Sequence, residues 1–168
     1  MRKNRKGMVV YMIKGIDFIN DSKEMFDKKE IIIKANNNKE YTIEITPKIK
    51  DTELNKIINI LMKNAEYCNK KNKEYNFVID MFAQIIKAFS NIQFNKYKDT
   101  WKQIQHDIQV CSALIDLGVY NQIIEQFDKG SIIKLEESFA KYQKSFKMIN
   151  NQVLSQKLKD DKDGKISI

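Results

Sequence analysis

The stretch Tyr41–Met62 reads YTIEITPKIKDTELNKIINILM and changes its hydrophobic period midway. In its first half Tyr41, Ile43 and Ile45 are apolar, whereas the residues between them are polar. Alternation with a period of two is typical of a β-strand that buries one face, and Pro47 cannot donate to a strand ladder. The second half has apolar residues at steps of three and four, which is the period of an amphipathic helix. The sequence therefore predicts a strand that leads directly into a helix.

A second strand is expected before this one. Ile31, Ile32 and Ile33 are β-branched, and the asparagines at 36–38 can adopt the backbone conformations of a turn. Residues 30–47 are thus predicted to form a β-hairpin. Because an isolated hairpin is only marginally stable in water, its apolar face should pack against helices.

The chain downstream of the hairpin is expected to be helical. Apolar residues recur at helical spacing in the segments 54–68, 78–92, 101–115, 120–127 and 132–153. The second of these segments is apolar nearly all round and is predicted to be the central helix. The expected boundary residues are Asp51 or Thr52 as the first N-cap, Asp99 or Thr100 as the third, Gly118 after the third helix, Asp128 and Gly130 after the fourth, and Ser131 at the start of the last.

These patterns predict a mainly α fold, namely a bundle of about four to five helices with an N-terminal β-hairpin. A length of 168 residues is close to that of one domain. The expected limits are a disordered basic tail at 1–7, a single domain at 8–158 (hairpin 30–47, helical part 51–158) and a frayed, charged tail at 159–168.

The last predicted helix has the most regular apolar pattern. Its residues are spaced 3, 4, 3, 4, 3, 4, which is the heptad spacing of a coiled-coil seam. This seam consists of Ile132, Leu135, Phe139, Tyr142, Phe146, Ile149 and Val153. Its partner groove could belong to the rest of this chain, to a second copy or to a foreign protein.

Three aromatic residues, Phe94, Tyr97 and Trp101, cluster where two predicted helices join. They are expected either to plug a corner of the core or to form an exposed patch that takes a partner segment. Trp101 and the seam residues are therefore the candidate protein-interaction residues.

The formal charge of +8 suggests nucleic acid as a partner, but half of it lies in residues 2–6. Both arginines of the chain, Arg2 and Arg5, are there as well. Arginine is the side chain that reads guanine edges, so its absence elsewhere argues against sequence-specific DNA recognition and leaves at most weak, lysine-based binding. Cys68 and Cys111 lie inside helical patterns and are expected to be reduced core thiols of a cytoplasmic protein.

The sequence does not predict a catalytic, cofactor-binding or metal-binding motif. None of the five glycines belongs to a clustered phosphate-binding loop, and no Cys/His/carboxylate group has metal-ligand spacing. The single histidine, His106, is followed by Asp107, and neighbours in a helix point in different directions. The sequence contains no run of about 18 apolar residues, so no membrane span is predicted. We therefore expect a protein without catalytic, cofactor or metal sites.

In layout, the strand Tyr41–Pro47 (YTIEITP), the immediate helix Thr52–Met62 (TELNKIINILM) and the helices up to a charged tail resemble a known class of proteins. These are the small assembly proteins of tailed bacteriophages that infect AT-rich Gram-positive bacteria, especially the tail assembly chaperones. The resemblance covers roughly residues 30–155, and the first 29 residues depart from it. It implies a non-enzymatic protein in the host cytoplasm, possible presence in the virion, binding to the tape-measure protein and self-association through helices. A phage-encoded inhibitor of a host defence or polymerase complex is the alternative.

Overall fold

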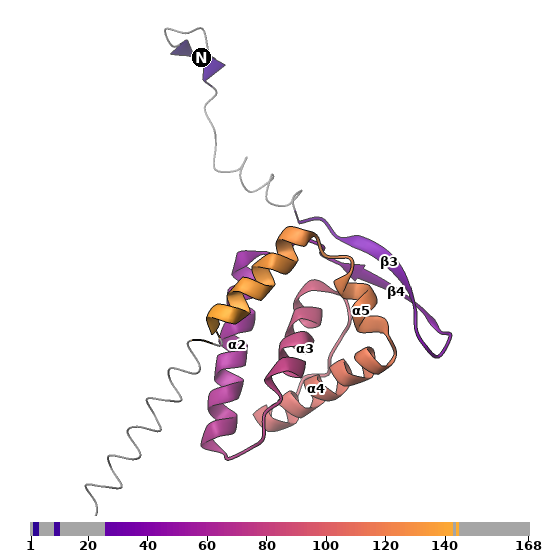
Figure 1. Ribbon diagram of the computed structural model, residues 1–168, viewed down its shortest axis with the longest axis vertical. Coiled ribbons are helices and arrows are strands. Elements are labelled where there is room, and N and C mark those ends of the chain that lie inside the picture. The colour runs from indigo at the N-terminus through magenta and orange to yellow at the C-terminus, as the bar shows by residue number, and fades with distance from the viewer. Residues whose placement is uncertain (1, 4–8, 11–25, 143, 145–168) are drawn as a thin grey trace, which may run out of the picture.

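The computed structural model describes residues 2–3, 9–10, 26–142 and 144, and it confirms the predicted fold class (Figure 1). The strands are β1 (Arg2–Lys3), β2 (Val9–Val10), β3 (Lys29–Lys34) and β4 (Glu40–Ile45). The labelled helices are α2 (Asp51–Lys70), α3 (Phe77–Phe89), α4 (Thr100–Asp116) and α5 (Val119–Ile124). A further helix covers residues 129–142 and is called here the 129–142 helix.

The two shortest strands, β1 and β2, form an antiparallel pair of their own. Strand β1 falls within the segment expected to be a disordered tail. Residues 1, 4–8 and 145–168 lie outside the described part of the chain, so the predicted limits of the domain and of its two tails stay predictions.

The β3–β4 hairpin has the predicted position and buries one face. Ile31 lies opposite Ile43, and Ile33 lies opposite Tyr41. Since side chains alternate between the faces of a strand, these residues share one face, on which Ile33 and Ile43 are almost completely buried. Ile32 points to the other face and is 73% exposed. The alternation of apolar residues thus correctly indicates the buried face, although Tyr41, near the hairpin tip, stays exposed.

Both ends of the hairpin are joined to distant parts of the chain. Near its base, the amide of Thr46 donates to the carbonyl of Phe89 at 2.8 Å. At its tip, the amide of Asn36 donates to the carbonyl of Leu117 at 2.9 Å. Gly118 follows in the left-handed conformation with φ of 69°, and a Cβ there would lie 2.9 Å from Asn36 Oδ1. Glycine is therefore required at 118 both by its backbone conformation and by the close approach of the turn.

Helix α3 is the central helix, as predicted, and contacts both α2 and α4 (Figure 1). Its side chains Ile85, Ile86 and Phe89 belong to one core that also receives β4, α2 and α5. Among the described helices, none is both long enough and apolar enough to cross a membrane.

Two predicted helix starts are wrong. Helix α2 begins at Asp51 and its N-cap is Lys50, which makes no side-chain capping bond, so neither Asp51 nor Thr52 is the cap. The final described helix begins at residue 129 rather than at Ser131. Its capping group is Asp128, whose Oδ1 accepts from the amide of Ser131 at 2.6 Å. The Ser131 hydroxyl instead accepts from the buried amide of Ile49 at 2.9 Å and ties this helix to the segment after the hairpin.

Candidate functional site

The described half of the heptad seam faces the core of its own chain. Leu135, Phe139 and Tyr142 are each no more than 7% exposed, and Ile132 packs against the core while partly buried. The ring of Tyr142 stacks on that of Phe77, with centroids 5.1 Å apart and planes 11° apart. These seam residues therefore hold the 129–142 helix in place. Their predicted role in binding a partner stays a prediction.

The remaining seam residues are Phe146, Ile149 and Val153. They lie outside the described residues.

Trp101, Tyr97 and Phe94 are less buried than the seam residues Leu135, Phe139 and Tyr142. Each ring is half-buried and has a lysine ammonium over it. The pairs are Lys73 over Trp101 at 5.6 Å, Lys102 over Tyr97 at 4.8 Å and Lys87 over Phe94 at 5.5 Å. Such cation–π contacts stabilise exposed rings by about 0.5–1 kcal/mol.

Trp101 lines an open groove at the surface between the start of α3 and the first half of α4. This feature, called here the Trp101 groove, is lined by Tyr75, Phe77 and Val78 on one side and by Trp101, Gln105 and Ile108 on the other. Val78 is 48% exposed, so an apolar side chain meets solvent at the groove. The three α4 residues follow at steps of four and three, which places them on one face of the helix.

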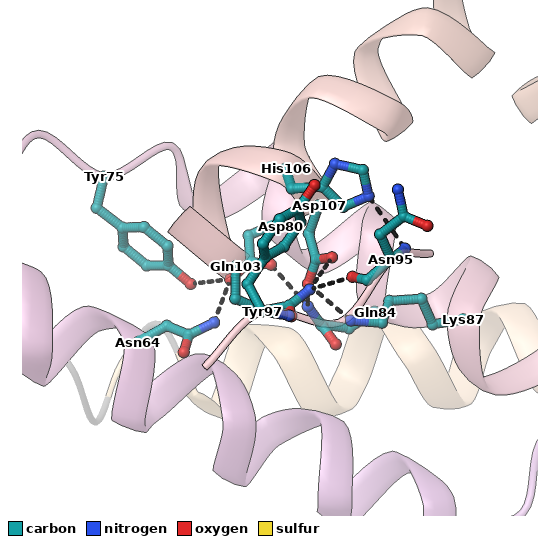
Figure 2. Close-up of polar contacts among 10 residues, drawn as sticks. All are labelled: Asn64, Tyr75, Asp80, Gln84, Lys87, Asn95, Tyr97, Gln103, His106 and Asp107. Carbon is teal, nitrogen blue, oxygen red and sulfur yellow. Dashed lines mark hydrogen bonds and ion pairs between the residues drawn. The ribbon is translucent and has the colours of Figure 1, made fainter. Parts of the chain in front are cut away.

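A buried polar network joins α2, α3 and α4 (Figure 2). At its centre lies Asp80, whose side chain is completely buried. One carboxylate oxygen, Oδ2, accepts from Tyr75 Oη at 2.6 Å and from Asn64 Nδ2 at 2.8 Å. The other, Oδ1, accepts from Gln84 Nε2 at 2.8 Å. Three donors thus compensate for the desolvation of this carboxylate.

Gln84 links this carboxylate to a second one. Its Nε2 also lies 3.2 Å from Asp107 Oδ2, which accepts from the Lys87 ammonium at 2.7 Å. Gln103 Nε2 donates to Asp107 Oδ1 at 2.8 Å. The two acidic side chains therefore share one amide, and a half-buried lysine ends the chain of contacts at the surface.

The same network fixes the segment between α3 and α4. Gln103 also donates to the carbonyl of Asn95 at 3.1 Å and accepts from the amide of Tyr97 at 2.7 Å. His106 Nε2 accepts from the amide of Asn95 at 3.1 Å, and the His106 ring packs edge-on against Tyr97. His106 thus positions the backbone of the segment between α3 and α4.

The arrangement of Asp80 and Asp107 is suited to holding helices together. Each carboxylate oxygen already accepts at least one hydrogen bond, and the two residues are 0% and 2% exposed. A substrate has no access to either. Within the described ranges, no group of three or more His, Cys, Asp or Glu side chains could hold a metal ion.

Burial also controls the ionisable groups around this network. It raises the pKa of Tyr75, and the adjacent Asp80 carboxylate raises that pKa further by its negative charge and by accepting a hydrogen bond from the phenol. Burial raises the pKa of Cys111 to about 12 and that of Cys68 in the same direction. Both cysteines are buried and free, as predicted. At neutral pH they are protonated and unreactive.

This network was not predicted from the sequence, although part of its pattern is visible there. Asp80, Gln84 and Lys87 are spaced four and three apart on a helix that is otherwise apolar. Polar residues on one face of a helix that is predicted to be central are candidates for a buried network, although their partners on another helix cannot be read from that spacing. Gln103 and Asp107, four apart on α4, supply the matching face.

No protein-family model matches this chain, and no match was found among curated proteins or solved structures.

Proposed function

We propose that this chain is a non-enzymatic protein-interaction module that binds a helical segment of another protein in the Trp101 groove. The observation that supports this proposal is the groove itself, with exposed Val78 beside Trp101 and Ile108. An apolar centre containing tryptophan is typical of the energetically dominant part of a protein interface. Amide side chains such as Gln105 offer hydrogen bonds at its edge.

A helix is the segment expected to fit. Helix-in-groove recognition uses apolar side chains at steps of three, four and seven on the bound helix. The α4 wall presents Trp101, Gln105 and Ile108 at the same repeat, so successive turns of a bound helix would meet successive turns of α4.

The specific role proposed is that of a bacteriophage tail assembly protein of the chaperone type, with the tape-measure protein as partner. The support for this role is the resemblance in layout over residues 30–155. Members of that family are often made in two lengths through a ribosomal frameshift, and Gly164–Lys165 can be encoded by a run of G and A on which ribosomes slip. We therefore expect an overlapping reading frame just downstream and a long tape-measure gene after it. If the flanking DNA contains neither of these nor any other virion gene, this role must be abandoned.

The binding site is tested with purified partner, namely the tape-measure protein encoded nearby. Val78→Lys and Ile108→Lys would place an ammonium in the groove, and each should weaken binding at least about tenfold. Ile133→Lys is the matched control, because Ile133 is 53% exposed on the 129–142 helix away from the groove. Equal affinities for the groove variants, the control and the unaltered chain would contradict the proposed site.

Binding to duplex DNA at several salt concentrations tests the alternative of a lysine-based nucleic-acid binder. The protein-binding proposal predicts weak, strongly salt-dependent association that is mostly lost when residues 1–7 are removed. Sub-micromolar affinity of the shortened chain for one DNA sequence would favour the alternative.

A further inference from the structure

We infer that the open edge of β4 at Thr42, together with the groove beside it, binds an extended segment of another protein by strand addition. The added strand would pair with the backbone of Thr42, place apolar side chains in that groove and carry a basic residue opposite Glu40. The inference does not rest on the proposed function, because Leu114 at this site lies about 20 Å along α4 from Trp101.

Strand β4 has one edge that is covered and one that is only partly covered. The first pairs with β3 along its whole length. At the second edge, the antiparallel bridge between Ile45 and Ser90 is the only pairing in the described part of the chain. The amide of Asn91 donates to the carbonyl of Glu44 there at 3.0 Å. The molecule therefore already adds a short extended segment to this edge, near the base of the hairpin.

This pairing ends at Asn91, because side-chain oxygens replace the backbone partners. In a continued antiparallel ladder the amide of Glu44 would donate to the carbonyl of Asn91. It donates to Asn91 Oδ1 at 3.1 Å instead. The next amide, that of Ile92, donates to the Ser90 hydroxyl at 3.2 Å. The chain thus turns away from β4 before it reaches Thr42.

Thr42 is the residue whose backbone is left open. Backbone groups of successive strand residues point to opposite edges, so the amide and carbonyl of Thr42 point the same way as those of Glu44. Among the residues that the structure describes, neither group has a hydrogen-bond partner. The other outer edge of the hairpin is partly covered by α5, since Gln122 Nε2 donates to the carbonyl of Lys34 at 2.9 Å. An unpaired donor and acceptor on an edge strand are the groups that a further strand needs.

A groove, called here the β4 groove, lies beside this open edge. It has a volume of about 370 Å³ and is formed by β4, the segment after α3 and the α4–α5 junction. In a strand paired with Thr42, the residues before and after the paired one would point to the buried face of the hairpin, where the groove lies. These two positions therefore favour apolar side chains. The apolar lining consists of Ile43, Ile92, Leu114, Leu117 and Val119.

A second copy of this chain is a poor occupant of the edge. Glu40 and Glu44 lie on the same face of β4 as Thr42, one on each side. In a symmetric antiparallel pairing centred on Thr42, Glu40 of each copy would lie opposite Glu44 of the other, and like charges in that position destabilise a sheet. The edge at Glu44 is also occupied by Asn91. A foreign segment that pairs only with Thr42 and Glu40 avoids both conflicts.

Glu40 sets the charge preference of the partner. It is exposed and forms no ion pair with any residue in the described ranges, although Lys34 lies opposite it in β3. Glu44, by contrast, is bonded to Lys28 at 2.9 Å. A lysine or arginine opposite Glu40 in the added strand would complete a cross-strand pair of opposite charge.

Peptides of about ten residues, selected from a random library against the complete chain, serve as the probe. Those that bind the open edge should alternate apolar with polar residues and carry a lysine or arginine. The readout is hydrogen exchange of the Thr42 amide, followed by nuclear magnetic resonance. A saturating peptide should slow this exchange at least about tenfold. The amide of Ile43, which points toward β3, should be protected with and without peptide.

Thr42→Pro removes the donor amide, and Ile32→Pro is its matched control. The two residues lie opposite each other in the hairpin, and each amide points to its own outer edge. Proline is tolerated where the amide of an edge strand faces solvent, so both variants should fold, which circular dichroism checks. Thr42→Pro should weaken peptide binding about tenfold, whereas Ile32→Pro should not change it.

Glu40→Gln tests the charge preference without altering the backbone. The side chain is exposed, so the fold should persist. Binding of a basic peptide should weaken about twofold to fivefold at low salt.

The inference is overturned if no selected peptide slows exchange of the Thr42 amide, or if Thr42→Pro and Ile32→Pro bind the peptide equally well. It is also overturned if this amide becomes protected without peptide as protein concentration rises and light scattering shows a dimer, since a second copy would then be the occupant. Selected peptides that all bind in the Trp101 groove would leave the Thr42 amide unprotected. That result would overturn the inference and leave the proposed function standing.

Discussion

Two buried helix faces in this molecule are built from different chemistry. The buried residues on the inner face of α2 are all apolar, namely Leu54, Ile57, Leu61, Ala65 and Cys68. Asn64, which donates to Asp80, is only partly buried there. The face between α3 and α4 is equally buried, but Asp80, Gln84 and Asp107 lie at its centre. Apolar contacts are non-directional and depend on shape and volume, whereas hydrogen-bonded carboxylates need donors at fixed positions.

The difference teaches where this fold tolerates change. The α2 face should accept residues of similar size, because any apolar side chain that fills the space keeps most of the stabilisation. The α3–α4 face should not, because removing one member leaves buried groups without partners. Four predictions test this comparison.

The largest effect is expected for Asp80→Ala. The substitution removes the acceptor for Tyr75, Asn64 and Gln84 and should lower the free energy of unfolding by about 3–5 kcal/mol. Asp116→Ala is the control, because that residue is exposed on α4 and its loss should change stability by less than about 0.5 kcal/mol. Urea denaturation measures the stability of both variants. Similar unfolding midpoints for Asp80→Ala and Asp116→Ala would show that the network contributes little to stability.

The second-largest effect is expected from alkaline pH, which should lower the free energy of unfolding through the polar face. The raised pKa of Tyr75 means that, above the ordinary tyrosine value of about 10, the unfolded chain has lost a proton that the folded chain keeps. Stability then falls as pH rises, by about 1.4 kcal/mol per pH unit for each such group. Cys111, whose pKa is raised to about 12, adds to this slope from about pH 9 upward. Tyr75→Phe should give a shallower decline in unfolding free energy between pH 9 and 11, and an unchanged slope would contradict the assignment.

Leu61→Met tests the apolar face. Leu61 is completely buried, yet methionine has nearly the same volume and no polar group, so the loss should be below about 1.5 kcal/mol. Asp80→Asn keeps size equally well but points an amide at three donors. It should therefore destabilise the chain more than Leu61→Met in the same thermal denaturation experiment. If Leu61→Met destabilised the chain more than Asp80→Asn, the proposed difference between the two faces would be wrong.

The smallest effect is expected for a carboxylate near the surface. Asp128 accepts from the amide and hydroxyl of Ser131, and these bonds hold its pKa below the usual value. Asp128→Ala should cost about 1 kcal/mol, as for other helix caps. The contribution of this group is present above the ordinary carboxyl pKa of about 4 and is lost as pH falls through the lower folded value. Unfolding free energies at pH 7 and pH 3 should therefore differ less in the variant than in the unaltered chain.

Periodicity was sufficient to predict the β3–β4 hairpin and the helices of the described part of the chain. The hairpin face of Ile43 and Ile45, the stripe on α2 and the central position of α3 all follow from where apolar residues recur. Helix starts were less predictable, since several polar residues near each start can cap and tertiary contacts decide among them. Ser131, expected to begin the last helix, is used instead by the amide of Ile49, which is 82 residues away in the chain.

The polar network and the groove could not be derived in the same way. Which of the many charged residues is buried depends on how α3 and α4 meet, and that contact joins residues 20 and 23 positions apart. Trp101 was singled out in the sequence by its residue type, whereas its groove neighbours Val78 and Tyr75 come from another helix and from the loop before that helix. Local spacing contains no information on that juxtaposition.

The contact between the hairpin tip and the α4–α5 junction also sets an order of events during synthesis. Asn36 and its acceptor on Asp116 are 80 residues apart. A ribosome that adds about 5–20 residues per second needs about 4–16 s to make that interval. For this time the nascent hairpin has Ile33 and Ile43 without the helices that later cover them. Translation speed between residues 36 and 118 should therefore influence how much of the chain aggregates before it folds.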